Sequence, residues 1–455
     1  MQSTSHQISQ FGELAMDLLD RAKRKGATEA DVMVADGNTF SVQVRLAAVD
    51  RLTKAREKRL GIRIFFARRS ASASTSDFSQ ESLDRLVSDT CSLAGAVAED
   101  PTSGLPPAEE MARDQPDLDL FDPIELGTET QITLARRAEA AAMAADPRIT
   151  NSEGADFNSS SGRVVLATSG GFMGEYSSSS FSCSVSPIAT EPGSEGMQRD
   201  SWYAVQRKFD RLDSPESVGQ EATRRTVRRL GSRKVSTRRG PVIFDQETAG
   251  SLLSHLCSAA SGYALYKGAS FLIGHLGKRL APDTITIYDD GRRPGGLGTR
   301  PFDGEGLPTR KTVFVENGIL KSYLLDTYSG RKLGLSSTGN AWRSIGDNPS
   351  VGPTNFYLVP GAPTPAEIIR TVKDGLYVTE LIGFGVNMVT GDYSRGVAGI
   401  WIENGELTYP VEEITIAGHL KQMFADIEMV GNDLEFRGRI ASPTIKIREM
   451  MIAGN

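Results

Sequence analysis

The side chains with the clearest capacity for chemistry lie in one apolar stretch, residues 245–262 (DQETAGSLLSHLCSAASG). Its His255 and Cys257 are residue types that bind zinc or act as a base and nucleophile pair. The common helical zinc motif places two His residues four positions apart, with a Glu after the first. Residues 254–259 read Ser-His-Leu-Cys-Ser-Ala, with one His, no Glu and no second His. The stretch therefore lacks that motif.

A helix over residues 245–262 would position these two side chains. Its apolar residues recur at helical spacing: Leu252, Leu253, Leu256, Ala259 and Ala260. Asp245 is typical of a helix N-cap, and Gly262 is typical of a stop that needs positive φ. Side chains two positions apart on a helix point about 200° apart, so His255 and Cys257 would not meet. We expect a buried, unreactive Cys257 and a hydrogen-bonded His255.

The remaining histidines, His6, His275 and His419, are isolated in the sequence. None has a His, Cys or carboxylate at the spacing that metal ligands take on a helix or turn. One alternative stays open, in which residues distant in sequence form a metal site of an autonomous peptidase, with His255, His275 or His419 among the ligands.

Residues 383–394 (GFGVNMVTGDYS) are the best candidate for a peptide-binding cleft. Polar side chains gather there between glycines, where a backbone can approach a ligand closely: Asn387, Thr390, Asp392, Tyr393 and Ser394. The same residues would also form a hydrogen-bonded turn between two strands. Both interpretations stay open at this point.

Several ordered motifs resemble the TldD/TldE (PmbA) family of bacterial and archaeal zinc peptidases. They are spread over the second half of the chain: residues 315–329 (VENGILKSYLLDTYS), 337–340 (STGN), 383–394, 403–405 (ENG), 415–418 (TIAG) and 451–454 (MIAG). The similarity covers nearly the whole chain and is strongest from about Pro241 onward. Within the family the chain is similar to the TldE/PmbA side.

The resemblance implies that the zinc ligands are missing. The TldD side carries a His-Glu-x-x-x-His helix and a later Cys, and these helix positions fall here on Ser254, His255 and Ala259. The Cys loop would fall between Gly431 and Pro443, where there is no Cys. We therefore expect no catalytic residue and no metal or other cofactor in this chain. Zinc would be held by a TldD-like partner in a heterodimer that degrades or processes unfolded peptides, and residues 383–394 would lie near its central cleft.

Composition limits the other classes of function. The 455 residues carry a net charge of −6, which gives no reason to expect nucleic acid or an anionic membrane as partner. The densest basic cluster, residues 224–239, has no interleaved aromatics, so we expect a solvated helix face or a contact with an acidic surface. Three cysteines, Cys91, Cys183 and Cys257, indicate reduced thiols in the cytoplasm. We see no signal peptide or membrane span.

The pattern of elements predicts an α+β protein with a large β-rich C-terminal domain covered by helices. We expect four parts: an N-terminal α+β domain (1–100), a linker (101–124), a middle α+β region (125–235) and the C-terminal domain (236–455). The segment 100–123 holds five of the 21 prolines, which favours a linker. Asn317-Gly318 and Asn404-Gly405 predict tight hairpins. Ser79 and Ser214 predict helix starts, Gly26 predicts the end of an N-terminal helix, and the alternation over residues 31–35 and 40–46 predicts two short strands. Besides the peptidase subunit and the autonomous enzyme, a homodimeric scaffold without a peptide role is a third hypothesis.

Overall fold

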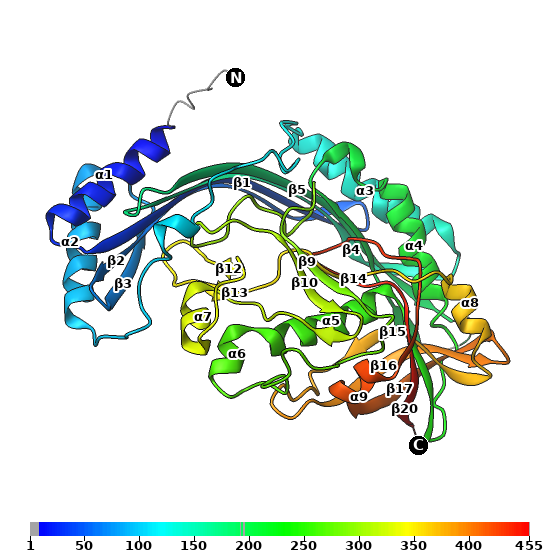
Figure 1. Ribbon diagram of the computed structural model, residues 1–455. Coiled ribbons are helices and arrows are strands. Elements are labelled where there is room, and N and C mark those ends of the chain that lie inside the picture. Colours follow the sequence, from blue (N-terminus) through cyan, green and yellow to red (C-terminus); the bar gives the residue numbers. More distant parts are fainter. Residues whose placement is uncertain (1–8, 192, 194–195, 455) are drawn as a thin grey trace, which may run out of the picture.

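The computed structural model describes residues 9–191, 193 and 196–454. Within them, seven strands form one long antiparallel sheet that arches over the C-terminal part of the chain (Figure 1). Its order is β3-β2-β1-β4-β5-β6, with β7 also paired to β5. The strands are β1 (Glu29–Arg45), β2 (Ala48–Phe66), β3 (Arg69–Thr75), β4 (Ile149–Thr168), β5 (Met173–Thr190), β6 (Met197–Arg199) and β7 (Trp202–Gln206).

Helices cover the outer face of this arch (Figure 1). One pair lies at the β3 end and the other at the β5 end: α1 (Gln10–Arg24) with α2 (Gln80–Ala96), and α3 (Thr128–Ala145) with α4 (Pro215–Val227). Ser79 and Ser214 cap α2 and α4 by accepting from backbone N–H groups of the first turn, which confirms both predicted helix starts. Gly26, at φ +90°, ends α1 as expected.

The arch joins parts of the chain that sequence analysis treated separately. Two short strands were expected at residues 31–35 and 40–46, but β1 runs unbroken through Gly37, which pairs with both β2 and β4. Because β1 pairs with β4, residues 1–100 and 125–235 share one sheet. The segment between them, 101–124, contains a 3-10 turn (Ala108–Glu110) and packs Leu105, Met111, Leu118 and Leu120 into the interior.

The C-terminal part holds two further sheets that enclose α5 (Gln246–Ala260). The larger sheet has the order β17-β16-β15-β8-β20-β18: β17 (Glu406–His419), β16 (Asp392–Glu403), β15 (Asp374–Ile382), β8 (Arg238–Phe244), β20 (Ile445–Ala453) and β18 (Ile427–Val430). The smaller has the order β11-β10-β9-β14-β19: β11 (Ile319–Leu320), β10 (Lys311–Glu316), β9 (Ile287–Asp290), β14 (Phe356–Leu358) and β19 (Ile440–Ala441). Helix α5 contacts β8 and β15 on one side and β14 and β19 on the other.

Short elements complete this region: β12 (Ala341–Trp342), β13 (Ser350–Val351), α6 (Gly262–Tyr266), α7 (Thr327–Leu333), α8 (Pro365–Arg370) and α9 (Leu420–Ala425). A 3-10 turn (Phe209–Arg211) follows β7 in the arch. Asn317-Gly318 and Asn404-Gly405 both have positive φ at each residue, as the predicted tight hairpins require. The expected α+β class, with a β-rich C-terminal region and covering helices, is confirmed. Among the described residues, no helix has the length and apolar character needed to cross a bilayer.

The basic cluster at residues 224–239 is the expected solvated face only in part, with Arg224, Arg233, Lys234, Arg238 and Arg239 exposed. Arg225 is buried beside Asp200 and Asp245, and Arg229 pairs with Glu380 at 2.5 Å. The acidic partners of these two arginines are therefore within the chain itself, where they hold α4 against β15.

A buried ion triad fastens the arch to the C-terminal part. Asp31 on β1 accepts from Arg63 on β2 (Nη2–Oδ2, 2.6 Å) and from Arg343 just after β12 (Nη1–Oδ1, 2.5 Å). The exposed fractions of the Asp31, Arg63 and Arg343 side chains are 1%, 7% and 0%. Burial alone would raise the pKa of Asp31, but the charges of Arg343 and Arg63 outweigh it and lower that pKa. Close by, Gly61 lies against the Gly346 backbone, which leaves no room for a Cβ.

We predict that Asp31→Ala lowers the free energy of unfolding by about 3–5 kcal/mol, because two guanidinium groups would remain buried without their counter-ion. Asp36→Ala on the same strand is the control, since Asp36 pairs with the exposed Arg56 and such pairs contribute about 0–1 kcal/mol. Denaturant unfolding of both variants measures the difference. Equal losses would contradict a fastening role for Asp31.

Candidate functional site

Helix α5 forms where it was predicted, and its ends explain where the candidate side chains lie. Asp245 accepts from the Thr248 N–H at 2.9 Å, as an N-cap does. Gly262 differs from the expectation of a positive-φ stop. It begins α6 instead, and a Cβ there would overlap the Ser329 side chain of α7. The glycine is thus required by the close packing of α6 on α7.

The three motif positions on α5 have different surroundings. Ser254 and His255 are half-buried, whereas Ala259 is fully buried and has no side-chain ligand atom. Cys257 is buried, and burial raises the pKa of its thiol well above the ordinary value, so it is an inert thiol as expected.

His255 was expected to be hydrogen-bonded, and the structure corrects this. Its Nε2 is buried without a hydrogen-bond partner, because the ring packs edge-to-face on Tyr393 with centroids 6.1 Å apart. Burial, together with the charge of Arg395, lowers the pKa of His255. The ring is therefore held in its neutral form.

Residues 383–394 lie beside α5 through this contact of Tyr393 with His255. Asn387 Oδ1 accepts from the Val389 and Thr390 N–H groups at 2.9 and 3.3 Å. Thr390 Oγ1 donates to Asp392 Oδ2 at 2.6 Å. These side chains form the hydrogen-bonded turn that was one of the two interpretations.

Two further candidates in this loop have different roles. The Ser394 N–H donates to Gly385 O at 2.6 Å, and Tyr393 is a core residue with 1% exposure. Whether Asn387, Thr390, Asp392, Tyr393 and Ser394 contact a peptide stays a prediction.

The residues present do not fit a zinc site. His275 Nδ1 lies 3.0 Å from Ile273 O, and His419 Nδ1 accepts from the Lys421 N–H as the cap of α9. His6 lies outside the described residues. Within residues 9–191, 193 and 196–454, no three His, Cys, Asp or Glu residues form a group able to hold a metal ion. No step through zinc is therefore derived for this chain.

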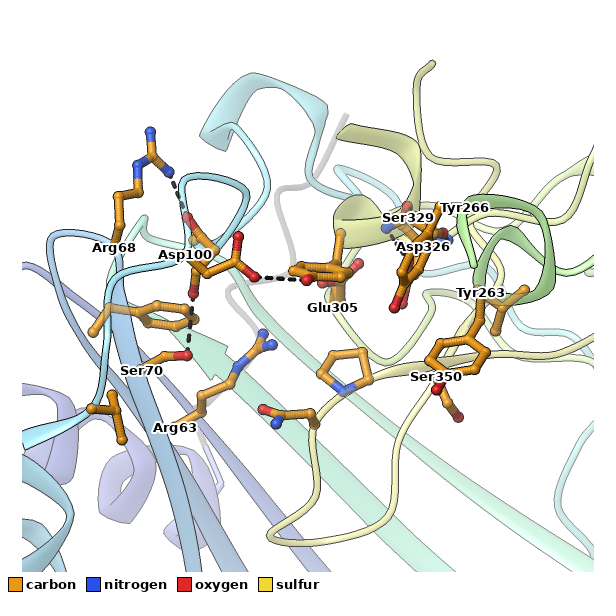
Figure 2. Close-up of a pocket in the computed structure, with 18 of the residues that line it drawn as sticks. Arg63, Arg68, Ser70, Asp100, Tyr263, Tyr266, Glu305, Asp326, Ser329 and Ser350 are labelled. Atoms are coloured by element: carbon orange, nitrogen blue, oxygen red, sulfur yellow. Dashed lines mark hydrogen bonds between the residues drawn. The ribbon is translucent and has the colours of Figure 1, made fainter. Parts of the chain in front are cut away.

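A pocket of about 690 Å³ lies between the arch and the C-terminal part. Figure 2 shows Arg63, Arg68, Ser70 and Asp100 on one side, with Tyr263, Tyr266, Asp326 and Ser329 on the other. The side chains of β2, β3, α6, α7 and β13 meet here. We call it the central pocket. Sequence analysis missed it, because its walls come from two stretches, residues 63–104 and 261–351, that are far apart in the sequence.

One wall of the central pocket is aromatic. The rings of Tyr263 and Tyr266 lie edge-to-face at 5.4 Å, and those of Tyr266 and Tyr328 at 5.9 Å. The Tyr328 hydroxyl donates to Asp100 Oδ2 at 2.6 Å. This wall offers apolar surface with a polar rim, a combination that suits a peptide side chain.

Glu305 and Arg63 form the charged part of the central pocket. Glu305 is 3% exposed, and its Oε2 accepts from the Thr327 N–H at 2.8 Å. Burial, reinforced by the charge of Asp303, raises the pKa of Glu305 to about 7. Arg63, held by Asp31, opposes this shift. The pocket therefore contains a carboxyl group that exchanges its proton near neutral pH.

Three comparisons with known proteins show the family and the fold of the chain. Family models described as PmbA/TldA metallopeptidase domain 1, central domain and C-terminal domain match residues 30–94, 121–230 and 237–454. "Metalloprotease PmbA" of Escherichia coli O157:H7 is 42% identical over 430 residues, 93% of this chain and 92% of that protein. Matches of this extent define a metallopeptidase-related protein. The chain belongs to the PmbA/TldD family.

Solved structures share the fold. A proposed modulator of DNA gyrase from Bacteroides thetaiotaomicron superposes with a TM-score of 0.91 at 27% identity, covering 99% of this chain and 100% of that one. TldE of Thermococcus kodakarensis superposes with a TM-score of 0.86 at 22% identity, covering 97% of this chain and 100% of that one. At that identity the second match shows the fold alone.

The raised pKa of Glu305 predicts a pH effect on stability. The folded state keeps a proton up to about pH 7, whereas an unfolded Glu loses it near its ordinary pKa of about 4.3. Stability should therefore fall as pH rises between these values, by at most about 1.4 kcal/mol per pH unit. Glu305→Gln removes the titrating group, so it should unfold at higher denaturant than wild type at pH 8 and much less so at pH 4.

Glu57→Gln, at an exposed position on β2, is the matched control and should show no such pH dependence. Denaturant unfolding at several pH values measures the effect. A Glu305→Gln variant whose stability relative to wild type is constant from pH 4 to pH 8 would contradict a raised pKa.

Proposed function

We propose that this chain is the non-catalytic, TldE-like subunit of a cytosolic two-subunit metallopeptidase. A TldD-like chain holds the zinc, and unfolded peptides are the substrate. The observation that carries the proposal is that α5 lacks the zinc-binding residues of the motif. The helix forms as predicted, yet Ala259 is buried and has no ligand atom, and the first two motif positions are Ser254 and His255. His255 is neutral and its ring packs on Tyr393, so we interpret it as a packing residue and not as a metal ligand.

An exposed apolar surface beside α5 supports a partner at this place. Five apolar residues are at least two-fifths exposed: Ile273 at 49%, Leu276 at 41%, Ile382 at 49%, Phe384 at 99% and Val389 at 55%. The segments that carry them are neighbours, because the Phe271 N–H donates to Met388 O at 2.9 Å. Large apolar side chains gathered on a surface mark interaction sites. We assign this apolar surface to the TldD-like subunit.

The central pocket supports the peptide role. Its tyrosine wall and its buried Glu305 and Arg63 give apolar and hydrogen-bonding surface along one cavity. An unfolded peptide offers the complementary groups along its length. In this proposal the chain guides the peptide while the partner cleaves it.

We predict that the chain co-purifies with a TldD-like protein from the same cell and that peptide hydrolysis requires both. Phe384→Asp should abolish co-purification and hydrolysis, because it places a charge in the apolar surface. Its melting temperature should match wild type, since Phe384 is 99% exposed. Met197→Asp, at 68% exposure on β6, is the control that should still bind.

Two outcomes would reject this role. Peptide hydrolysis by the isolated chain that disappears in His255→Ala would show an autonomous enzyme. Self-association that excludes the TldD-like chain, with proteolysis unchanged when the gene is deleted, would show a homodimeric scaffold.

A further inference from the structure

A second pocket, of about 550 Å³, lies between strands β5 and β7 of the arch and the segments around Trp342 and Arg439. Four arginines, Arg207, Arg300, Arg437 and Arg439, are among the residues that line it, and none of the lining residues is acidic. We call it the arginine pocket. Arg437 is paired with Glu435 at 2.7 Å, so the positive charge without an ion pair among the described residues comes from Arg207, Arg300 and Arg439. Such charges attract anions.

Arg300 is the most unusual of these arginines. It is 6% exposed, and both Nε and Nη2 are buried without a hydrogen-bond partner. Its Cζ lies 3.9 Å from the centroid of the Trp342 ring, which fixes the plane of the guanidinium. Burying an unpaired charge is costly, and burial indeed lowers the pKa of Arg300. The side chain is thus held ready for a partner that the chain does not supply.

The nearest acidic groups are committed elsewhere. Asp303 accepts through Oδ1 from the Glu305 and Leu307 N–H groups and through Oδ2 from Ala341 N–H. Asp289 accepts from the Thr354 N–H and from Asn340 Nδ2. Both carboxylates act on Arg300 only through their charge at a distance. Neither carboxylate accepts a hydrogen bond from the Nε or Nη2 atom of Arg300.

Three neighbours widen the positive site. Arg439 is exposed and makes no side-chain hydrogen bond or ion pair among the described residues, and its Cζ lies 4.2 Å from the same Trp342 ring. Arg207 is fixed, because it donates to Ser179 O and Leu297 O. The Tyr176 hydroxyl also lacks a hydrogen-bond partner within the described chain, which leaves it free to donate.

Strand β7, beside the arginine pocket, favours an anion that belongs to an extended peptide. Among the described strands, β7 pairs only with β5, so its second edge carries no strand, and there Arg437 Nη1 donates to Tyr203 O. An extended peptide pairs with such an edge whatever its sequence. Val205 of β7 and Arg207 just after it both line the arginine pocket. Trp342 is already covered by two guanidinium groups, so it offers no free face to a nucleobase.

We propose that the arginine pocket binds a carboxylate side chain of an extended peptide, with Arg300 and Arg439 as the specificity-determining residues. The planar guanidinium fork matches a carboxylate with paired hydrogen bonds. This proposal rests on the peptide role proposed above and adds a preference for acidic residues.

The test is direct binding to the isolated full-length chain. The probes are a short fluorescein-labelled Ser/Thr peptide amide with Glu residues, its Gln counterpart, and inorganic phosphate as competitor. Wild type should bind the Glu peptide about tenfold or more tightly than the Gln peptide, because hydrogen bonds to charged groups are the strong ones. Arg300→Gln and the surface variant Arg439→Gln should each reduce this preference. Arg448→Gln, at an exposed arginine of β20, should keep it.

Equal affinity for the two peptides would overturn the proposal, as would a preference that survives in both arginine variants. Phosphate binding that depends on Arg300, without binding of the Glu peptide, would show an inorganic anion site and reject the peptide ligand. The outcome is separable from that of the subunit role. If the chain prefers the Glu peptide through its arginines but does not co-purify with a TldD-like protein, the carboxylate site stands and the subunit role is rejected. If it co-purifies but shows no such preference, the subunit role stands and the carboxylate site is rejected.

Discussion

The carboxylate of Asp31, buried between Arg63 and Arg343, is the interaction on which the arrangement of the molecule depends. It joins a sheet strand to a loop 312 positions away in the sequence. Each of its two arginines then leads to a different pocket. Arg63 continues into the central pocket beside Glu305, and Arg343 follows Trp342, which lines the arginine pocket. The buried Asp31 carboxylate therefore helps to hold the arch against the C-terminal part near both cavities, together with the bond from Arg207 to Leu297 O at the arginine pocket.

Some of the buried polar groups that lack a hydrogen-bond partner among the described residues lie where function is proposed, and most of the others lie around Arg225, Arg228 and Arg229. Buried polar groups in proteins are nearly always hydrogen-bonded, so each exception asks for a reason. His255 Nε2 and the Tyr393 hydroxyl are both buried and unpaired, and both lie beside the apolar surface assigned to the partner subunit. Arg300 is unpaired in the arginine pocket. Unpaired polar groups destabilise the fold at these positions, and such local costs are typical of sites that bind another molecule.

Local sequence signals predicted local structure well. The caps Ser79, Ser214 and Asp245 and the two Asn-Gly hairpins follow from side chains within a few positions of each other. The interaction of a side chain with its own backbone turn decides such features, so the sequence carries them directly.

Features set by long-range contacts were not predictable in this way. Gly262 was expected to be a stop, but its role comes from Ser329 on another helix. Residues 35–38 interrupt the apolar alternation, yet pairing on both sides keeps β1 continuous. Glu305 stands in a glycine-rich loop without a motif around it, and only the folded chain places it beside Arg63. The missing zinc ligands, in contrast, were visible as residue types at fixed spacing.

The most direct test of the subunit account is the zinc content of the purified chain after dialysis against a weak chelator, compared with that of the complex with its TldD-like partner. The account predicts almost no zinc in the isolated chain and about one ion per heterodimer in the complex, since the protein ligands of the TldD-like partner would retain the metal. About one zinc ion per isolated chain would contradict it, because this chain would then hold a metal site of its own.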